Sequence, residues 1–233
     1  MTKAFRNTAL FTVLIILGVQ WGFYKHYISQ FPLFKDKTIV IHIHGALLMG
    51  WLLLLVVQPL LIQAGKAQLH RTIGKLSYVL GPLIIIFLFL IGRQGFQRGV
   101  GNFPEQENLA VMVLDVRGFL SFAIFWALAM YNRKTPDTHM RYMIATGILG
   151  IGTGVGRGLM NSFGYSLWDA LAVTDVLGLA IVGLLLGFDI YRKKNTKPFL
   201  TVFAVLLMGA VLWQIRDSQL WQSVARTYAD LFY

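Results

Sequence analysis

The sequence predicts an all-α fold, a polytopic bundle of seven transmembrane helices, and three observations lead to this class. Hydrophobic residues make up 56% of the 233 residues, and charged residues only 13%, against about 25% charged in an ordinary globular domain. The mean hydropathy is +0.62. The apolar residues also gather in runs that approach the roughly 20 residues a helix needs to cross a bilayer.

Seven runs qualify as spans, and residues that end apolar helices separate them. The expected spans are Thr8–Tyr24, Ile39–Ile62, Ile73–Ile91, Leu109–Met130, Met140–Met160, Leu167–Ile190 and Phe199–Ile215. Residues 1–215 are therefore expected to form one seven-helix transmembrane domain. The segment from Arg93 to Glu107 holds three glycines and a proline, which predicts a loop.

The segment 216–233 differs from the spans because polar residues interrupt its apolar ones at helical spacing. The apolar positions are Leu220, Trp221, Val224, Tyr228, Leu231 and Phe232. This pattern predicts an amphipathic helix that lies on the outer surface of the membrane.

Basic residues outnumber acidic ones, 21 to 10, which gives a net charge of +11. About twelve of the basic residues fall at the N-terminus and in the second, fourth and sixth loops, and about seven fall on the other side. This asymmetry places the N-terminus in the cytoplasm. The excess of basic residues then reflects membrane topology and does not indicate a nucleic-acid partner. The expected partner is the lipid bilayer, and the expected location is a bacterial inner (plasma) membrane that the chain crosses several times.

The chain contains no cysteine, which excludes disulfides, thiolate zinc sites, iron–sulfur clusters and a cysteine nucleophile. No Ser-x-x-Lys or His-Glu-x-x-His motif occurs, and no hydrolase triad can be assembled. Whether the protein is an enzyme is left open by these observations.

Glycines recur through the fifth expected span, from Gly147 to Gly158, and imitate a phosphate-binding loop. That motif needs a strand before it and a helix after it, whereas here it lies inside an apolar run. The glycines four residues apart, Gly150, Gly154 and Gly158, instead predict close packing of two helices in lipid, within the chain or in a homo-oligomer. They also leave room for a ligand beside Arg157.

Charged and polar residues lie inside the outer halves of four spans, about 5–12 Å from the outer ends at about 1.5 Å per residue. Ionisable residues at such depth are costly and mark candidate sites. His44, Asp115 and Asp175 offer a first shell for iron, manganese or zinc. The remaining members are candidates for binding a quinone, another small lipophilic ligand or an anion: His42, Arg117, Arg157 and Asn161. The alternative is a structural ionic network that joins the helices.

Two further histidines lie at the cytoplasmic edge on different spans. His70 precedes the third span and His139 the fifth. Two imidazoles at one depth can be the axial ligands of a b-type haem, or they can be interfacial residues beside arginines that attract anionic lipid. Covalent c-type haem is excluded, because the chain has no Cys-x-x-Cys-His.

At these residues the sequence resembles known membrane proteins. His44-Gly45-Ala46-Leu47-Leu48-Met49, Gln58-Pro59 and His70-Arg71-x-x-Gly74-Lys75 are similar to the haem-bearing core of di-haem cytochrome b membrane proteins. With His139-Met-Arg141-Tyr142-Met143, the pattern also resembles a bacterial multi-span family with an early-helix histidine and a His-Arg-x-x-Gly segment. The resemblance covers about residues 41–158 and implies a haem held by His70 and His139.

The sequence therefore predicts a membrane protein that holds a redox or metal centre between its helices, with a metal ion or b-type haem as cofactor, and that acts in electron transfer or as a membrane oxidoreductase. The alternative is a non-enzymatic assembly factor or ligand-binding membrane protein whose buried charges form a structural network.

Overall fold

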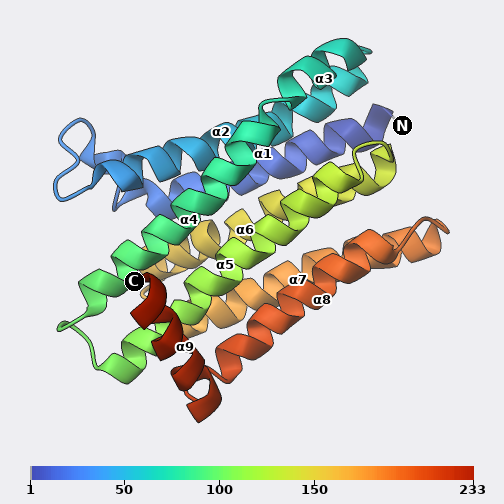
Figure 1. Cartoon of the computed structure of the whole chain (residues 1–233). Coiled ribbons are helices and arrows are strands. Elements are labelled where there is room, and N and C mark those ends of the chain that lie inside the picture. Colours follow the sequence, from blue (N-terminus) through green and yellow to red (C-terminus); the bar gives the residue numbers. More distant parts are fainter. Residues whose placement is uncertain (1) are drawn as a thin grey trace.

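The computed structural model describes residues 2–233, with side chains from residue 3 onward, and confirms the predicted all-α bundle (Figure 1). The helices are α1 (Thr2–Tyr24), α2 (Ile39–Gln63), α3 (Ala67–Gly74), α4 (Ser77–Gly99), α5 (Glu105–Tyr131), α6 (Pro136–Phe163), α7 (Leu167–Tyr191), α8 (Lys197–Gln214) and α9 (Gln219–Phe232), with a 3-10 turn, η1 (Ile28–Gln30), after α1. Seven spans are long and apolar enough to cross a membrane, with α3 and α4 counted as one.

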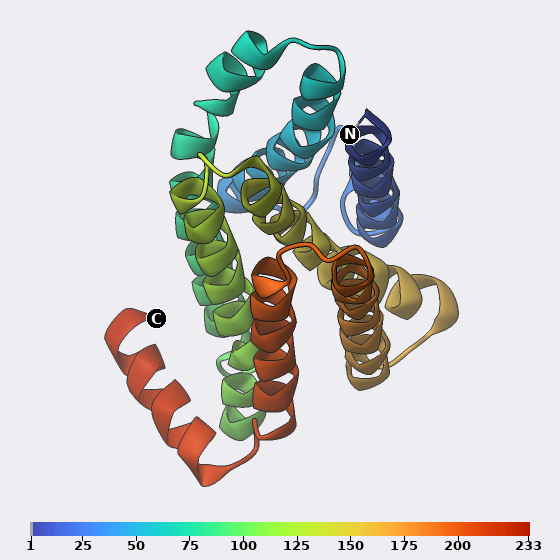
Figure 2. The same cartoon turned by 90° about the vertical axis from the view of Figure 1, so that its right-hand side faces the viewer.

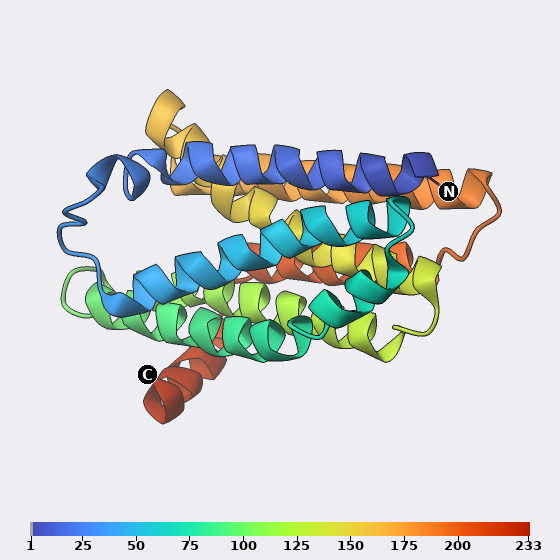
Figure 3. The same cartoon turned by 90° about the horizontal axis from the view of Figure 1, so that it is seen from above.

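Helix α6 lies at the centre of the bundle and contacts α1, α2, α5, α7 and α8. The long helices run side by side, with the N-terminus and the α7–α8 turn at one end and the α1–α2 connection at the other (Figure 3). This arrangement places the polar residues of α6 between helices on several sides.

The core is built from apolar side chains of α1, α2 and α4 to α8, among them Trp51, Ile84 and Phe125. A buried indole needs a partner for its N–H. Trp51 finds one across the bundle, where its Nε1 donates to Thr146 Oγ1 at 2.9 Å. The apolar spans thus bury a continuous core, and the polar groups within it are bonded to one another.

Helices α1 and α6 pack with their backbones almost in contact, which confirms close helix packing along the predicted glycine stripe. A Cβ at Gly154 would lie 2.7 Å from Val19 Cα, and a Cβ at Gly22 would collide with the carbonyl oxygen of Gly154. A Cβ at Gly158 would lie 2.5 Å from the Trp21 ring. The predicted homo-oligomer through this stripe finds no support here, because α1 of the same chain covers it.

The loop predicted from Arg93 to Glu107 is too long, because α4 continues to Gly99 and α5 begins at Glu105. Asn108 explains the difference. Its side chain fills the space that Gly99 leaves open, and its Nδ2 donates to the Phe96 carbonyl at 3.1 Å. The Phe96 carbonyl, which also accepts from the Val100 N–H at 3.1 Å, is thereby held by two hydrogen bonds at the C-terminal end of α4.

The C-terminal segment forms the expected amphipathic helix, α9, which leaves α8 at an angle (Figure 2). Its buried face, Trp221, Ala225 and Ala229, packs in one cluster with Leu109 and neighbouring residues of α5. Trp221 Nε1 also donates to the Leu109 carbonyl at 2.9 Å. Helix α9 is therefore docked on the bundle along the side that carries Trp221, Ala225 and Ala229, whereas the expected apolar positions Leu220, Val224, Leu231 and Phe232 are exposed.

Candidate functional site

A cavity of about 260 Å³ lies between α5, α6, α7 and α8. Glycines create much of it: at Gly118, Gly152 and Gly178, an added Cβ would find no described atom within 4 Å. Most of the remaining wall is apolar, with leucine and isoleucine side chains from all four helices. The cavity is thus a mostly apolar space inside the membrane-spanning region, large enough for a small molecule.

One wall of the cavity carries an ion pair. Arg117 Nη1 of α5 donates to Asp175 Oδ2 of α7 at 3.0 Å, and to the Gly209 carbonyl of α8 at 3.5 Å. The two side chains keep 17% and 23% of their surface exposed, so the pair is not sealed in the core. It joins three helices and leaves this wall close to neutral.

Arg157 of α6 also lines the cavity, and its charge is not matched in the same way. Its guanidinium carbon lies 5.0 Å from the centre of the Phe23 ring, and the side chain is exposed. Within the part of the chain that the structure describes, it forms no ion pair and no hydrogen bond. An arginine that lines an apolar cavity and keeps donors free is suited to bind a carboxylate or another anion.

Arg157 acts electrostatically on two further predicted residues, His44 of α2 and Asp115 of α5. The Nδ1 atom of His44 is buried and has no hydrogen-bond partner among residues 3–233. Asp115 faces α4, where an added Cβ at Gly92 would lie 2.9 Å from its Cβ. The charges of Asp115 and Arg157 influence each other without a direct ion pair shorter than 4 Å.

The predicted outer group therefore divides into two parts. Asp115 and Arg117 are two residues apart on one helix and so point about 200° apart. Arg117 faces Asp175 and the cavity, whereas Asp115 faces α4. Arg157 of the central helix lines the cavity together with Arg117.

This division corrects the predicted metal site. Among the described residues, no three histidine, aspartate or glutamate side chains converge as metal ligands would. Asp175 is held by Arg117, and His44 has Arg157 as its charged neighbour. The arrangement of His44, Asp115 and Asp175 as a metal shell is wrong because helix rotation turns Asp115 and Asp175 in different directions.

His42 and Asn161, predicted as ligand-binding residues, lie away from the cavity and have partners near the end of α1. His42 Nδ1 is 2.6 Å from Tyr27 Oη. Asn161 Nδ2 donates to the Gly22 carbonyl at 3.0 Å, and its Oδ1 is 2.8 Å from His26 Nε2. These contacts fasten the α1–α2 connection to the bundle.

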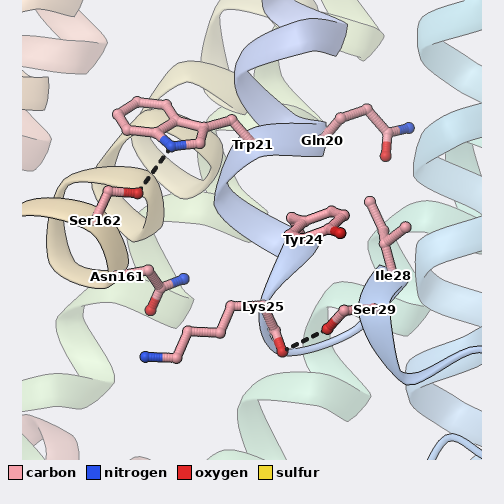
Figure 4. A pocket seen from close by; sticks show the side chains of 8 residues that line it. All are labelled: Gln20, Trp21, Tyr24, Lys25, Ile28, Ser29, Asn161 and Ser162. Carbon is pink, nitrogen blue, oxygen red and sulfur yellow. Dashed lines mark hydrogen bonds between the residues drawn. The ribbon is translucent and has the colours of Figure 1, made fainter.

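A second hollow, about 660 Å³ and more open, lies where α1 ends beside α6 (Figure 4). Trp21 Nε1 donates to Ser162 Oγ at 3.0 Å across it, and Ser29 Oγ donates to the Lys25 carbonyl at 3.1 Å. Aromatic and polar side chains alternate along this rim, as is typical of residues at a membrane–water interface. Its contacts join α1 to α6.

His70 and His139 interact electrostatically with each other at the opposite end of the bundle. With its amide oriented to satisfy its hydrogen bonds, Gln58 donates to His70 Nδ1 at 2.5 Å and accepts from the Gly74 N–H at 3.1 Å. His139 Nδ1 is 2.8 Å from the Ala129 carbonyl. These contacts do not test cofactor ligation by the two residues, which stays a prediction.

The sequence analysis missed a buried ion pair between α6 and α7. Arg141 Nε donates to Asp189 Oδ2 at 2.6 Å and its Nη2 to Oδ1 at 2.7 Å, while Nη1 donates to the Asp137 carbonyl at 2.8 Å. The side chains are 4% and 3% exposed. The signal was present, because Asp189 falls inside the apolar run of the sixth span, where a carboxylate requires a partner.

The fold and these sites define a multi-pass membrane protein. Over 163 residues the chain is 26% identical to the biotin transporter of Salmonella typhimurium (strain LT2), and it is equally similar to the biotin transporter of Salmonella typhi. The alignment covers 69% of this chain and 52% of each relative, so the chain spans about half the length of the curated relatives it matches. No family model and no solved structure matches the chain.

These similarities overturn the predicted redox or metal-centre function, including its haem, electron-transport and oxidoreductase aspects. Both relatives are described as transporters, and no cluster of metal-ligating side chains occurs among the described residues. The prediction failed because histidines and carboxylates inside a membrane also serve transport pathways, and their lateral arrangement cannot be read from spacing.

Proposed function

We propose that this chain is a membrane transporter, or the part of one that holds the substrate, for a small organic carboxylate of the class to which biotin belongs. The observation that carries the proposal is Arg157, which lines an apolar cavity and whose guanidinium forms no ion pair among the described residues. The similarity to biotin transporters supports the same class.

The chemistry of the cavity favours an anion with an apolar body. The Arg117–Asp175 pair is neutral in sum, so Arg157 supplies the net positive charge. A guanidinium binds a carboxylate through two parallel hydrogen bonds. The apolar walls suit a hydrocarbon chain or ring, and about 260 Å³ is just below the range of about 300–1,000 Å³ for ligand pockets, which favours a small substrate.

Polar side chains in the cavity wall can orient the rest of the substrate. Ser121, Thr153 and Thr174 lie on three different helices along its wall. Thr174 already donates to the Ala170 carbonyl at 2.9 Å, so its oxygen remains available as an acceptor. A few placed polar groups in an apolar pocket are the usual basis of ligand orientation.

Uptake into proteoliposomes tests the proposal. Vesicles that contain the purified protein should take up radiolabelled biotin, and other small carboxylates should compete with this uptake. The methyl ester of biotin, which lacks the anion, should compete poorly. Arg157→Gln should lower uptake by about ten- to a hundredfold, since a hydrogen bond to a charged group contributes about 1.5–3 kcal/mol.

Arg133→Gln is the matched control, because Arg133 is exposed in the turn between α5 and α6, away from the cavity. It should transport like the unchanged protein. If neither biotin nor any carboxylate in the panel is taken up or competes, the proposed function is wrong.

We further propose that the protein resides in a bacterial inner membrane with its N-terminus in the cytoplasm, because the N-terminal end of the bundle carries more basic residues. Reporter fusions at Lys134 and Lys194 should read cytoplasmic, and a fusion at Asn102 should read outside. A periplasmic reading at Lys194 contradicts this topology.

A further inference from the structure

The Arg117–Asp175 ion pair lines the cavity and uses only part of its hydrogen-bonding capacity. Arg117 Nη1 donates both to Asp175 Oδ2 and to the Gly209 carbonyl. The Nη2 and Nε atoms of Arg117 and the Oδ1 atom of Asp175 have no hydrogen-bond partner within residues 3–233. Both side chains also keep part of their surface exposed. The pair therefore holds unused donors next to an unused acceptor at the cavity wall.

The buried Arg141–Asp189 pair shows how a structural ion pair is built in this bundle. There both carboxylate oxygens accept from the guanidinium, and its third nitrogen donates to the Asp137 carbonyl. At Arg117–Asp175 a single hydrogen bond joins the two side chains. Within a membrane, polar groups without a protein partner need one from water or from a ligand. The unused groups of Arg117 and Asp175 are therefore suited to a polar partner in the cavity.

The packing of α6 against α7 brings Arg157 and this pair to one level of the bundle. An added Cβ at Gly156 would lie 3.6 Å from Thr174 Cγ2, so these two residues are neighbours across the helices. Arg157 follows Gly156 on α6, and Asp175 follows Thr174 on α7. At about 1.5 Å per residue, Arg157 and Asp175 lie within one helical turn of each other along the bundle. Since both line the same cavity, one small molecule can contact both.

Resting on the proposed function, we infer that the Arg117–Asp175 pair recognises a urea or amide group on the apolar body of the substrate, while Arg157 binds its carboxylate. A cyclic urea carries N–H donors beside a C=O acceptor, which is the complement of the pair. Its N–H can donate to Asp175 Oδ1, and its carbonyl can accept from Arg117 Nη2. Biotin has such a urea at the end opposite its carboxylate. The substrate class is thereby narrowed to carboxylates that carry a urea or amide.

Competition for uptake tests this recognition in proteoliposomes that contain the full chain. Radiolabelled biotin is the reporter, and desthiobiotin and nonanoate are the competitors. Desthiobiotin keeps the carboxylate and the cyclic urea, whereas nonanoate has the same carbon chain without the urea. Nonanoate should need about ten to a hundred times the concentration of desthiobiotin for half-inhibition, because it makes no hydrogen bonds to the charged pair.

The double variant Arg117→Met/Asp175→Leu removes the polar groups of the pair together. Replacement of an ion pair by apolar residues of similar size is often neutral for folding, and here it removes the partner of the urea. The ratio of half-inhibiting concentrations, nonanoate to desthiobiotin, should therefore fall close to one. Arg141→Met/Asp189→Leu is the matched control, because it makes the same substitutions in an ion pair outside the cavity. It should keep the ratio of the unchanged protein.

Asp175→Asn is a second variant that keeps the size of the side chain. Its amide oxygen can still accept from Arg117 Nη1, and its NH2 group then replaces the free acceptor and opposes the N–H of the urea. The added net positive charge acts on both competitors alike, so it leaves the ratio unaffected. Loss of the acceptor should lower the ratio about tenfold.

The outcomes distinguish the recognition from the proposed function. A ratio near one in the unchanged protein, an unchanged ratio in either folded variant, or an equal loss in the control overturns the recognition, while transport of carboxylates stands. Should the double variant fail to fold, Asp175→Asn decides. Absence of any carboxylate uptake by the unchanged protein overturns the proposed function and the recognition with it.

Discussion

Two arginines on the central helix α6 occupy opposite chemical situations. Arg141 is buried near the start of the helix and held in a two-bond ion pair by Asp189. Arg157, about four turns further along, is exposed at a cavity and has no such partner in the described structure. We call the surroundings of Arg141, where the guanidinium is buried and paired, the closed site. The surroundings of Arg157, where the guanidinium is exposed and unpaired in the described structure, are the open site.

The difference shows how a membrane protein separates structural from functional charge. A buried guanidinium is tolerated when its charge is paired and each of its three nitrogens donates, as at Arg141, where the Nη1 atom donates to a backbone carbonyl. A guanidinium with unused donors must face water or a ligand, because lipid offers no acceptor. Arg157, which is exposed and lines the cavity, meets this condition.

Breaking the closed site should give the largest loss of stability. Arg141→Gln leaves the Asp189 carboxylate buried without a cation, which is expected to lower the free energy of unfolding by about 3–5 kcal/mol. Thermal denaturation or denaturant titration of the protein in detergent would measure it.

Arg157→Gln is the matched control, since it makes the same substitution on the same helix at the open site. It should change stability by less than about 1 kcal/mol, because no ion pair is lost. Equal destabilisation by the two substitutions would contradict the comparison.

Much of the bundle could be predicted from the sequence, because an apolar run of sufficient length must be a helix in a membrane. The second span, expected at Ile39–Ile62, is observed at Ile39–Gln63. The end of α4 could not be predicted, because Asn108 extends the helix through a contact from across the loop.

The candidate site was only half predictable, for a geometric reason. Sequence gives the depth of Asp115, Arg117 and Arg157 along the membrane, but it does not give the rotation of each helix. The opposite directions of Asp115 and Arg117 follow from the 3.6-residue repeat, whereas the pairing of Arg117 with Asp175 required the fold. Asp189 was missed because it lies one residue from the expected end of its span.

Filling the cavity should give the next largest effect and would sharpen the functional side of the comparison. Gly178 of α7 lines the cavity, and an added Cβ there meets no described atom within 4 Å, so Gly178→Leu directs its side chain into the open space. We expect biotin uptake to fall on the order of tenfold, which corresponds to about 1.4 kcal/mol.

Gly187 provides the control on the same helix. An added Cβ there also meets no described atom within 4 Å, but the residue is exposed and lies outside the cavity. Gly187→Leu should leave uptake unchanged, and neither variant should lose stability, because leucine favours a helix over glycine by about 0.5–1 kcal/mol. A similar loss of uptake in both variants would show that the cavity is not the transport site.

The smallest expected effect is a dependence of stability on pH. It tests whether helices separate more easily at the end of the molecule that holds Arg157 and Asp115 than at the end that holds Arg141. Tyr228 and Tyr233 pack together with a ring separation of 5.2 Å, and burial raises the pKa of both. A raised pKa means that the folded protein holds these protons more tightly than the unfolded chain does. The stability they contribute is therefore complete below the ordinary tyrosine pKa of about 10 and is lost as pH rises above it.

Helix α9 should consequently loosen from α5 in alkali, while the end of the bundle that holds the buried Arg141–Asp189 ion pair stays folded. Limited proteolysis of α9 between pH 8 and pH 11, with tyrosine ionisation followed by ultraviolet absorbance, would measure this. Tyr233→Phe keeps the aromatic contacts with Phe89 and Phe96 but removes one titrating hydroxyl, so its α9 should be released at higher pH. Release of α9 at the same pH in both proteins would show that the buried hydroxyl of Tyr233 does not control this contact, and the difference between the two ends of α6 would then rest on the arginines alone.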